Sequence, residues 1–104
     1  MESRPYNYEF SPLAEQDLNE IFDYIALELS ALQAAVKLID RIQEEVERVC
    51  DFPFSRPLLR NKILREKGYR LLVVQNFNLF YVVENHTVVI KRVMHGKRNY
   101  ESLL

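Results

Sequence analysis

The sequence predicts an α+β fold in which a strand and two helices precede a three-stranded antiparallel meander. Two observations carry this prediction. Apolar residues recur at helical spacing from Ser11 to Asp51, whereas β-branched and aromatic residues form nearly continuous runs between Tyr69 and His95. With 104 residues, of which 48% are hydrophobic, the chain is long enough for one modest core. We therefore expect residues 1–104 to form a single two-layer domain.

The first expected elements are a short strand and a helix. Tyr6, Tyr8 and Phe10 alternate with polar residues, which is the period of a half-buried strand. Ser11 then offers an N-cap, and Pro12 suits the first position of a helix. Because the apolar residues of this helix follow at helical spacing, its acids are expected to face water. The apolar stripe comprises Ala14, Leu18, Ile21, Phe22, Ile25 and Leu29.

A second helix follows almost at once. Ser30 and Gln33 have the spacing of a capping box, and Phe52-Pro53 ends the helical pattern. The short sequence between the two helices predicts an antiparallel hairpin whose joint apolar face needs a cover. The stripe of the second helix comprises Ala35, Leu38, Ile39, Ile42, Val46 and Val49.

Three β-rich runs supply that cover. The connections between them, Gln75-Asn76 and Glu84-Asn85-His86, are short enough only for antiparallel hairpins. Because the runs are apolar at nearly every residue, we expect both faces of the middle strands to be covered. The helices should cover one face, and either the short tail Tyr100 to Leu104 or a partner protein the other. The runs are Tyr69 to Val74, Phe77 to Val83 and Thr87 to about His95.

Charge is divided between the two halves of the chain. From Ser11 to Asp51 there are ten acids and three bases, a net charge of −7; from Phe52 to Leu104 there are ten bases and three acids, a net charge of +7. A basic surface attracts polyanions and an acidic surface repels them, so the second half is expected to meet an anionic partner. The alternative is that each half only makes its own elements soluble.

No membrane span, secretion signal, metal or cofactor site is predicted. The chain has no run of about 18 apolar residues, and the start MESRPYNYEF lacks the apolar stretch of a signal peptide, so a cytoplasmic protein is expected. The single cysteine, Cys50, cannot form an internal disulfide. It lies in a helical apolar pattern, which indicates a small core residue rather than a nucleophile.

The stretch RVMHGKRNY, Arg92 to Tyr100, contains side chains that are suited to the cleavage of a phosphodiester. Metal-free RNA cleavage needs a base for the 2′-hydroxyl, a cation for the phosphorane and an acid for the leaving oxygen. His95 suits the acid or the base. Arg98 and Lys97 suit the cation, and Tyr100 suits base stacking or proton donation. The same residues also suit the protection of a sheet edge, so both interpretations stay open.

The order of these elements, together with three stretches, resembles the RelE/ParE superfamily, the toxins of bacterial type II toxin–antitoxin modules. The stretches are FSPLAEQDLNEIFDYIA, GYRLLVVQNFNLFYVV and VVIKRVMHGKRNY, and the resemblance covers Tyr6 to Leu104. RelE-like members cut mRNA on the ribosome without a metal, whereas ParE-like members inhibit DNA gyrase. The resemblance implies a hetero-oligomer with a cognate antitoxin, whose extended tail wraps the toxin, and a target that is either gyrase or the ribosome with its mRNA.

The ending RVMHG is similar to the Arg-Val-Leu-His ending of ParE-like toxins. Gly96-Lys97-Arg98 is similar to the Gly-Lys-Arg of RelE-like enzymes, which would give Arg98 a catalytic role. Asn78, however, aligns with the second catalytic arginine of those enzymes, and their lysine pair is reduced to Arg70 beside Leu72. The resemblance therefore favours gyrase inhibition. RelE-like mRNA cleavage and a non-toxic binding module of the same fold are the alternatives.

The two branches imply different site residues. A ribonuclease would use His95, Arg98 and Tyr100, although YoeB-like members carry their catalytic His-Tyr pair at the extreme C-terminus and here the two residues are separated. The basic connector RPLLRNKILREKG suits phosphates or a ribosomal groove, and equally an acidic antitoxin tail. An apolar antitoxin segment is expected against the sheet or the hairpin groove. The expected residues for target or antitoxin binding are Arg60, Lys62, Arg65, Arg70, Arg92, Lys97 and Arg98.

Overall fold

The computed structural model describes residues 6–104 of the chain. The predicted order of one strand, two helices and three strands is confirmed, with a short helix added in the connector. In this part of the chain no helix is both long enough and apolar enough to cross a bilayer. The elements are β1 (Asn7–Phe10), α1 (Pro12–Asp23), a π-helical turn (Tyr24–Glu28), α2 (Leu32–Val49), α3 (Lys62–Glu66), β2 (Arg70–Val74), β3 (Phe77–Glu84), β4 (Thr87–His95) and a 3-10 turn (Tyr100–Ser102).

The four strands form one sheet in the order β1-β4-β3-β2. The meander β2-β3-β4 is antiparallel as predicted, with Phe77 opposite His95 and Glu84 opposite Thr87. β1 is the exception, because it runs parallel to β4 with Asn7 opposite Thr87. Parallel strands need a long crossover between them. Here the helical hairpin, the connector and the other two strands together provide it.

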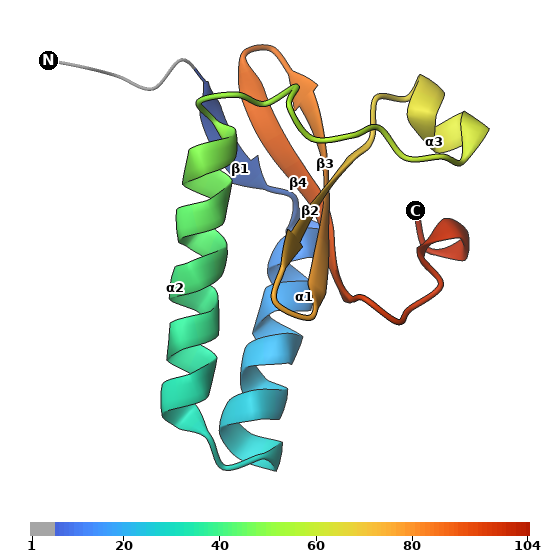
Figure 1. The fold of residues 1–104 in the computed structure, drawn as a ribbon. Coiled ribbons are helices and arrows are strands. Elements are labelled where there is room, and N and C mark those ends of the chain that lie inside the picture. The colour runs from blue at the N-terminus through green and yellow to red at the C-terminus, as the bar shows by residue number, and fades with distance from the viewer. Residues whose placement is uncertain (1–5) are drawn as a thin grey trace, which may run out of the picture.

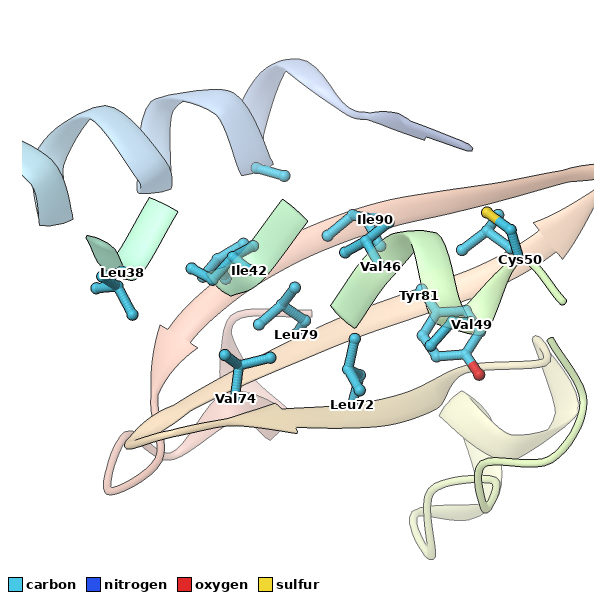
Figure 2. Close-up of a cluster of buried hydrophobic side chains, with 13 residues drawn as sticks. Leu38, Ile42, Val46, Val49, Cys50, Leu72, Val74, Leu79, Tyr81 and Ile90 are labelled. Atoms are coloured by element: carbon cyan, nitrogen blue, oxygen red, sulfur yellow. The ribbon is translucent and has the colours of Figure 1, made fainter. Parts of the chain in front are cut away.

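The helical hairpin covers one face of the sheet, as predicted (Figure 1). Figure 2 shows Ile42 and Val46 of α2 directed toward strand residues such as Leu79 and Ile90. Cys50 is fully buried in the same core, as expected for a small apolar residue. Each large side chain buried here stabilises the fold by roughly 1.5–3 kcal/mol relative to its exposed state.

The connector and the C-terminal tail cover the opposite face (Figure 1). Tyr100 and Leu104 of the tail pack against the apolar cluster on this face. The tail was one of the two predicted covers, whereas the contribution of the connector was not predicted. The buried members of the cluster are Leu59, Leu64, Phe80 and Met94.

One of the two predicted helix caps is present. The Ser11 hydroxyl accepts a hydrogen bond from the N–H of Ala14 at 3.1 Å, and Pro12 begins α1. The predicted capping box at Ser30 is wrong: the N-cap of α2 is Ala31, which makes no side-chain cap. Ser30 instead has a φ of 50°, which reverses the chain between the helices. The tight loop requires this left-handed backbone, and Ser30 is therefore not free to act as a cap.

One acid of α1 is turned inward. The expectation that the acids of this helix face water is wrong for Asp17, which is only 9% exposed. β1 stops at Phe10, so β4 has no neighbouring strand on this side beyond Ile90. The Asp17 carboxylate takes the place of that strand and accepts the N–H of Val93 at 2.9 Å. A backbone donor at a buried edge is thereby satisfied.

The same carboxylate holds Arg92. The Arg92 Nε donates to Asp17 Oδ2 at 2.8 Å, and Nη2 donates to Oδ1 at 3.0 Å. The pairing of β3 with β4 shifts by one residue at Lys91, and a bulge of this kind changes the direction of the side chains beside it. The hydrogen bond to Asp17 raises the pKa of Arg92. Because Arg92 also donates to the carbonyl of Leu103 at 3.2 Å, one carboxylate joins α1, β4 and the tail.

Removal of this carboxylate should destabilise the fold strongly. We expect Asp17→Ala to lower the free energy of unfolding by about 3 kcal/mol, because the Arg92 guanidinium and the Val93 N–H lose their partner. That loss corresponds to a decrease in Tm of roughly 10 °C or more, measurable by circular dichroism. Glu15→Ala removes an exposed acid from the same helix and should cost only about 0.5 kcal/mol. Equal losses in the two variants would contradict the anchoring role of Asp17.

Candidate functional site

An open groove of about 540 Å³ lies between the far half of the helical hairpin and the end of the sheet. Both helices extend beyond the strands in this region (Figure 1). The end of α1 and the start of α2 form one wall, and the β2–β3 turn with the end of β4 forms the other. A groove with an apolar floor suits a segment of a protein partner. The floor includes Ile21, Ile25, Leu38, Phe77 and Val93.

The tip of the hairpin exposes apolar side chains beside this groove. Leu29 was predicted to lie in the buried stripe, and that prediction is wrong, because Leu29 is 54% exposed. The π-helical turn Tyr24–Glu28 changes the helical phase just before it. Together with Tyr24, Leu29 lines the groove. This exposed apolar tip was not predicted, although Leu27 and Leu32 beside the loop, both also more than half exposed, were an available signal in the sequence.

The end of β4 forms the basic rim of the groove, which both His95 and Arg98 line. The chain turns sharply here, since the N–H of Arg98 donates to the carbonyl of His95 at 2.9 Å. The N–H of Gly96 donates to the carbonyl of Asn76 at 2.8 Å, and a Cβ at Gly96 would lie 3.3 Å from that oxygen. His95 Nδ1 accepts the N–H of Lys97 at 3.2 Å, so the neutral ring carries its proton on Nε2.

Tyr100 lies apart from this rim. Its ring packs on Phe80 with the ring centroids 4.8 Å apart. Phe77, whose ring meets that of His95 edge-on at 5.7 Å, belongs to the helical side of the sheet. Phe80 is three residues further along the strand and therefore faces the opposite side. Of the three residues predicted for a ribonuclease, two share the rim and Tyr100 lies across the sheet from them.

Two of the arginines expected to bind a partner, Arg92 and Arg70, make contacts with residues more than ten positions away in the chain. Arg92 is held by Asp17, as described above. Arg70 Nη1 donates to the carbonyl of Arg56 at 2.6 Å and to that of Phe54 at 3.2 Å, and its guanidinium lies over the Phe54 ring at 5.2 Å. These contacts fasten the start of the connector to β2. These contacts could not be predicted from sequence patterns, because the partners of both arginines lie many residues away.

Lys97 lies on the other side of the rim, beside a hollow of about 330 Å³. The lining includes His95, which borders both depressions, and Asn78 of β3. Asn78, which was expected to stand where RelE-like enzymes carry a catalytic arginine, contributes a neutral amide to this hollow. Lys97 is the permanent cation among the residues that line it.

The connector presents four exposed cations around α3, whose Leu64 is buried against the sheet. None of them takes part in the ion pairs found within residues 6–104. The connector and the acidic helices lie on opposite sides of the sheet (Figure 1). The charge asymmetry of the sequence is therefore an asymmetry between two faces of the molecule. The four cations are Arg60, Lys62, Arg65 and Lys67.

Comparisons with solved structures show chains of similar fold in two toxin–antitoxin systems. The chain is similar to one from the chromosomal ParDE toxin–antitoxin system of P. aeruginosa, with a TM-score of 0.69, 21% sequence identity and coverage of 89% of this chain and 98% of that chain. It is also similar to one from the toxin–antitoxin complex RelBE2 of Mycobacterium tuberculosis, with a TM-score of 0.59, 21% identity and coverage of 88% and 98%. This chain therefore shares its fold with both of these chains.

A match to a family model identifies the family of the chain. Residues 8–100 match the model described as the ParE toxin of the type II toxin-antitoxin system parDE. Because the match spans nearly the whole chain, the chain belongs to this family of toxins. A comparison with curated proteins gives no match.

Tyr81 links the connector to the core and gives a test of that link. Its fully buried phenol donates to the carbonyl of Pro53 at 2.7 Å. Burial raises the pKa of Tyr81 to about 12 from its ordinary value of 10.0, against the opposing charges of Arg70 and Arg56. The protonated phenol therefore contributes stability that is fully present below about pH 10 and is lost as the pH rises toward 12.

We expect the alkaline loss of stability to be smaller in Tyr81→Phe than in the wild type. At about pH 8 the variant should be less stable by about 1 kcal/mol, because it lacks the hydrogen bond to Pro53. At about pH 11.5 the difference should close or reverse, because the wild type loses up to roughly 2 kcal/mol by ionisation of the phenol in the unfolded state. Urea unfolding at both pH values measures the difference. If the difference in unfolding free energy between the two proteins is the same at both pH values, ionisation of Tyr81 is not coupled to unfolding.

Proposed function

We propose that this toxin arrests growth by binding DNA gyrase and that it does not cleave mRNA. The observation that supports this proposal is the position of Tyr100, across the sheet from His95. Metal-free RNA cleavage requires its acid, base and cation within hydrogen-bond reach of one phosphate. The rim retains His95 and Arg98, which suit recognition of a protein surface, because arginine is a frequent anchor of protein interfaces.

If the rim binds gyrase, substitutions should produce graded losses. We expect Arg98→Ala to weaken inhibition of supercoiling by about 10- to 30-fold, as for an interface anchor. His95→Ala should have a smaller effect, because no proton transfer depends on it. Lys37→Ala, a change on the exposed surface of α2, is the matched control and should retain full inhibition. Full activity of Arg98→Ala in supercoiling and growth assays would show that the working surface lies elsewhere.

One observation favours mRNA cleavage as a second candidate, namely that His95 and Arg98 share a rim. In that case His95→Ala should abolish specific mRNA cuts, with a loss on the order of 100-fold or more. Asn78→Arg should raise cleavage, because it restores a cation beside the hollow. The folding of the variant Tyr100→Ala must also be checked by thermal melting, because Tyr100 packs on Phe80 and its removal takes away that contact. Primer extension on mRNA from expressing cells decides between the two targets. Absence of both activities in the wild type would indicate a non-toxic binding module.

We also propose that the groove receives an apolar segment of a cognate antitoxin. The floor of the groove is apolar, and the rim offers Arg98 to an acid of the incoming chain. Burial of Tyr24 and Leu29, both more than half exposed here, would give such a complex its apolar centre. Both structural neighbours come from toxin–antitoxin systems. A short adjacent reading frame with an acidic tail is the expected source of the partner.

Two leucines allow a matched test of this groove. Leu29 and Leu13 are each 54% exposed, but Leu29 lines the groove and Leu13 lies at the start of α1 beside a different hollow. We expect Leu29→Glu to weaken antitoxin binding by about 30-fold or more, because it buries a charge in the apolar centre of the interface. Leu13→Glu should bind within about twofold of the wild type. Calorimetric titration with the product of the adjacent frame measures both, and equal affinities would place the antitoxin elsewhere.

A further inference from the structure

The connector carries a second interaction surface on the side of the sheet away from the groove. We propose that this surface, called here the connector patch, binds the phosphate backbone of nucleic acid. The proposal stands beside the proposed function and does not depend on it. The connector patch comprises Arg60, Lys62, Arg65 and Lys67.

The charge of the patch is available to a ligand. All four side chains are exposed, and no ion pair within residues 6–104 involves them. Four bases and one acid between Arg60 and Lys67 leave a net charge of +3. Arg65 Nη2 donates to the carbonyl of Arg60 at 2.8 Å, which orients one guanidinium and leaves its other N–H groups for a phosphate. A cluster of exposed cations attracts a polyanion chiefly through the release of its counterions.

The backbone that presents these cations is fixed to the body of the protein. Leu64 is buried against the sheet, and its N–H donates to the side chain of Asn61, the N-cap of α3, at 3.0 Å. The N–H of Leu59 donates to the carbonyl of Tyr69 at 3.0 Å. α3 is therefore fastened on both sides of its single turn. Binding orders only the cationic side chains, so the entropic cost is smaller than for a flexible basic tail.

The composition of the patch favours nucleic acid over an acidic protein segment. Stable protein interfaces need an apolar centre from which water is excluded. The groove offers such a centre, but it lies on the other side of the sheet. Among residues 60–67 the exposed apolar side chain is Ile63, at 63% exposure, and Leu58 lies just outside this range at 39%. Nucleic-acid interfaces are more polar, more positive and wetter, as this surface is. The acidic helices on the opposite face would also turn this side toward a polyanion.

Salt dependence tests the proposal directly. We would measure fluorescence anisotropy of a labelled duplex DNA and a labelled single-stranded RNA, each of about 20 nucleotides per strand, with the purified full chain. For two to four phosphate contacts, a fourfold increase in KCl should weaken duplex binding by roughly 10- to 150-fold and single-strand binding by roughly 7- to 50-fold. Lys62→Ala and Arg65→Ala should each reduce the slope of log K against log salt by about 1. Lys37→Ala, an exposed cation on the acidic face, should leave the slope unchanged.

The other outcomes of this experiment either identify the kind of nucleic acid or overturn the proposal. Preference for the duplex or for the single strand identifies which nucleic acid the patch serves. The proposal is overturned if neither probe binds at about 50 mM KCl, or if the double variant Lys62→Ala/Arg65→Ala keeps the slope of the wild type. It is also overturned if poly-glutamate displaces the probes at equal charge, because an acidic protein is then the partner. Thermal melts confirm that the variants are folded. Neither gyrase nor antitoxin is needed, so a negative result leaves the proposed function intact.

Discussion

The carboxylate of Asp17 at the open edge of β4 is the constraint on which the arrangement of this molecule depends. Beyond Ile90 the strand has no neighbour, and a buried N–H without an acceptor is costly. By accepting that N–H and holding Arg92, the carboxylate fixes α1 against the sheet. The width of the groove follows from this contact, since α1 is one of its walls. The position of the C-terminal tail depends on the same contact, because Arg92 also donates to the carbonyl of Leu103.

The sheet separates two surfaces of different chemistry. On the helical side, an apolar groove ends at a rim with His95 and Arg98. On the other side, the connector and the tail cover the apolar strands, and the connector presents four exposed cations. Tyr100 belongs to that second cover and completes it by packing on Phe80. If the proposed antitoxin segment occupies the groove, the opposite face remains open to a second partner.

The parts of the fold that follow from local rules were predictable. Periodicity alone located the two helices and the meander, and Ser11 announced the start of α1. The wrong predictions concern residues whose environment is set by partners that are distant in the sequence. An acid that faces water and one that satisfies a strand edge look alike in the sequence, and Asp17 meets Arg92 across 75 residues. His95 and Tyr100 are close along the chain, yet the pleat of the sheet and the turn after β4 put them on opposite faces.

The pairing of β1 has a consequence for how the protein is made. Asn7 lies opposite Thr87, and Ser11 donates to the carbonyl of Lys91, 80 residues away. A chain that emerges from the ribosome N-terminus first therefore exposes β1 and the apolar side of the helical hairpin until β4 has been synthesised. In that interval the nascent chain exposes apolar surface and an unpaired strand edge to chaperones and proteases. The rim lies at the end of β4 and in the turn after it, so an incomplete translation product lacks the surface that we propose contacts the target.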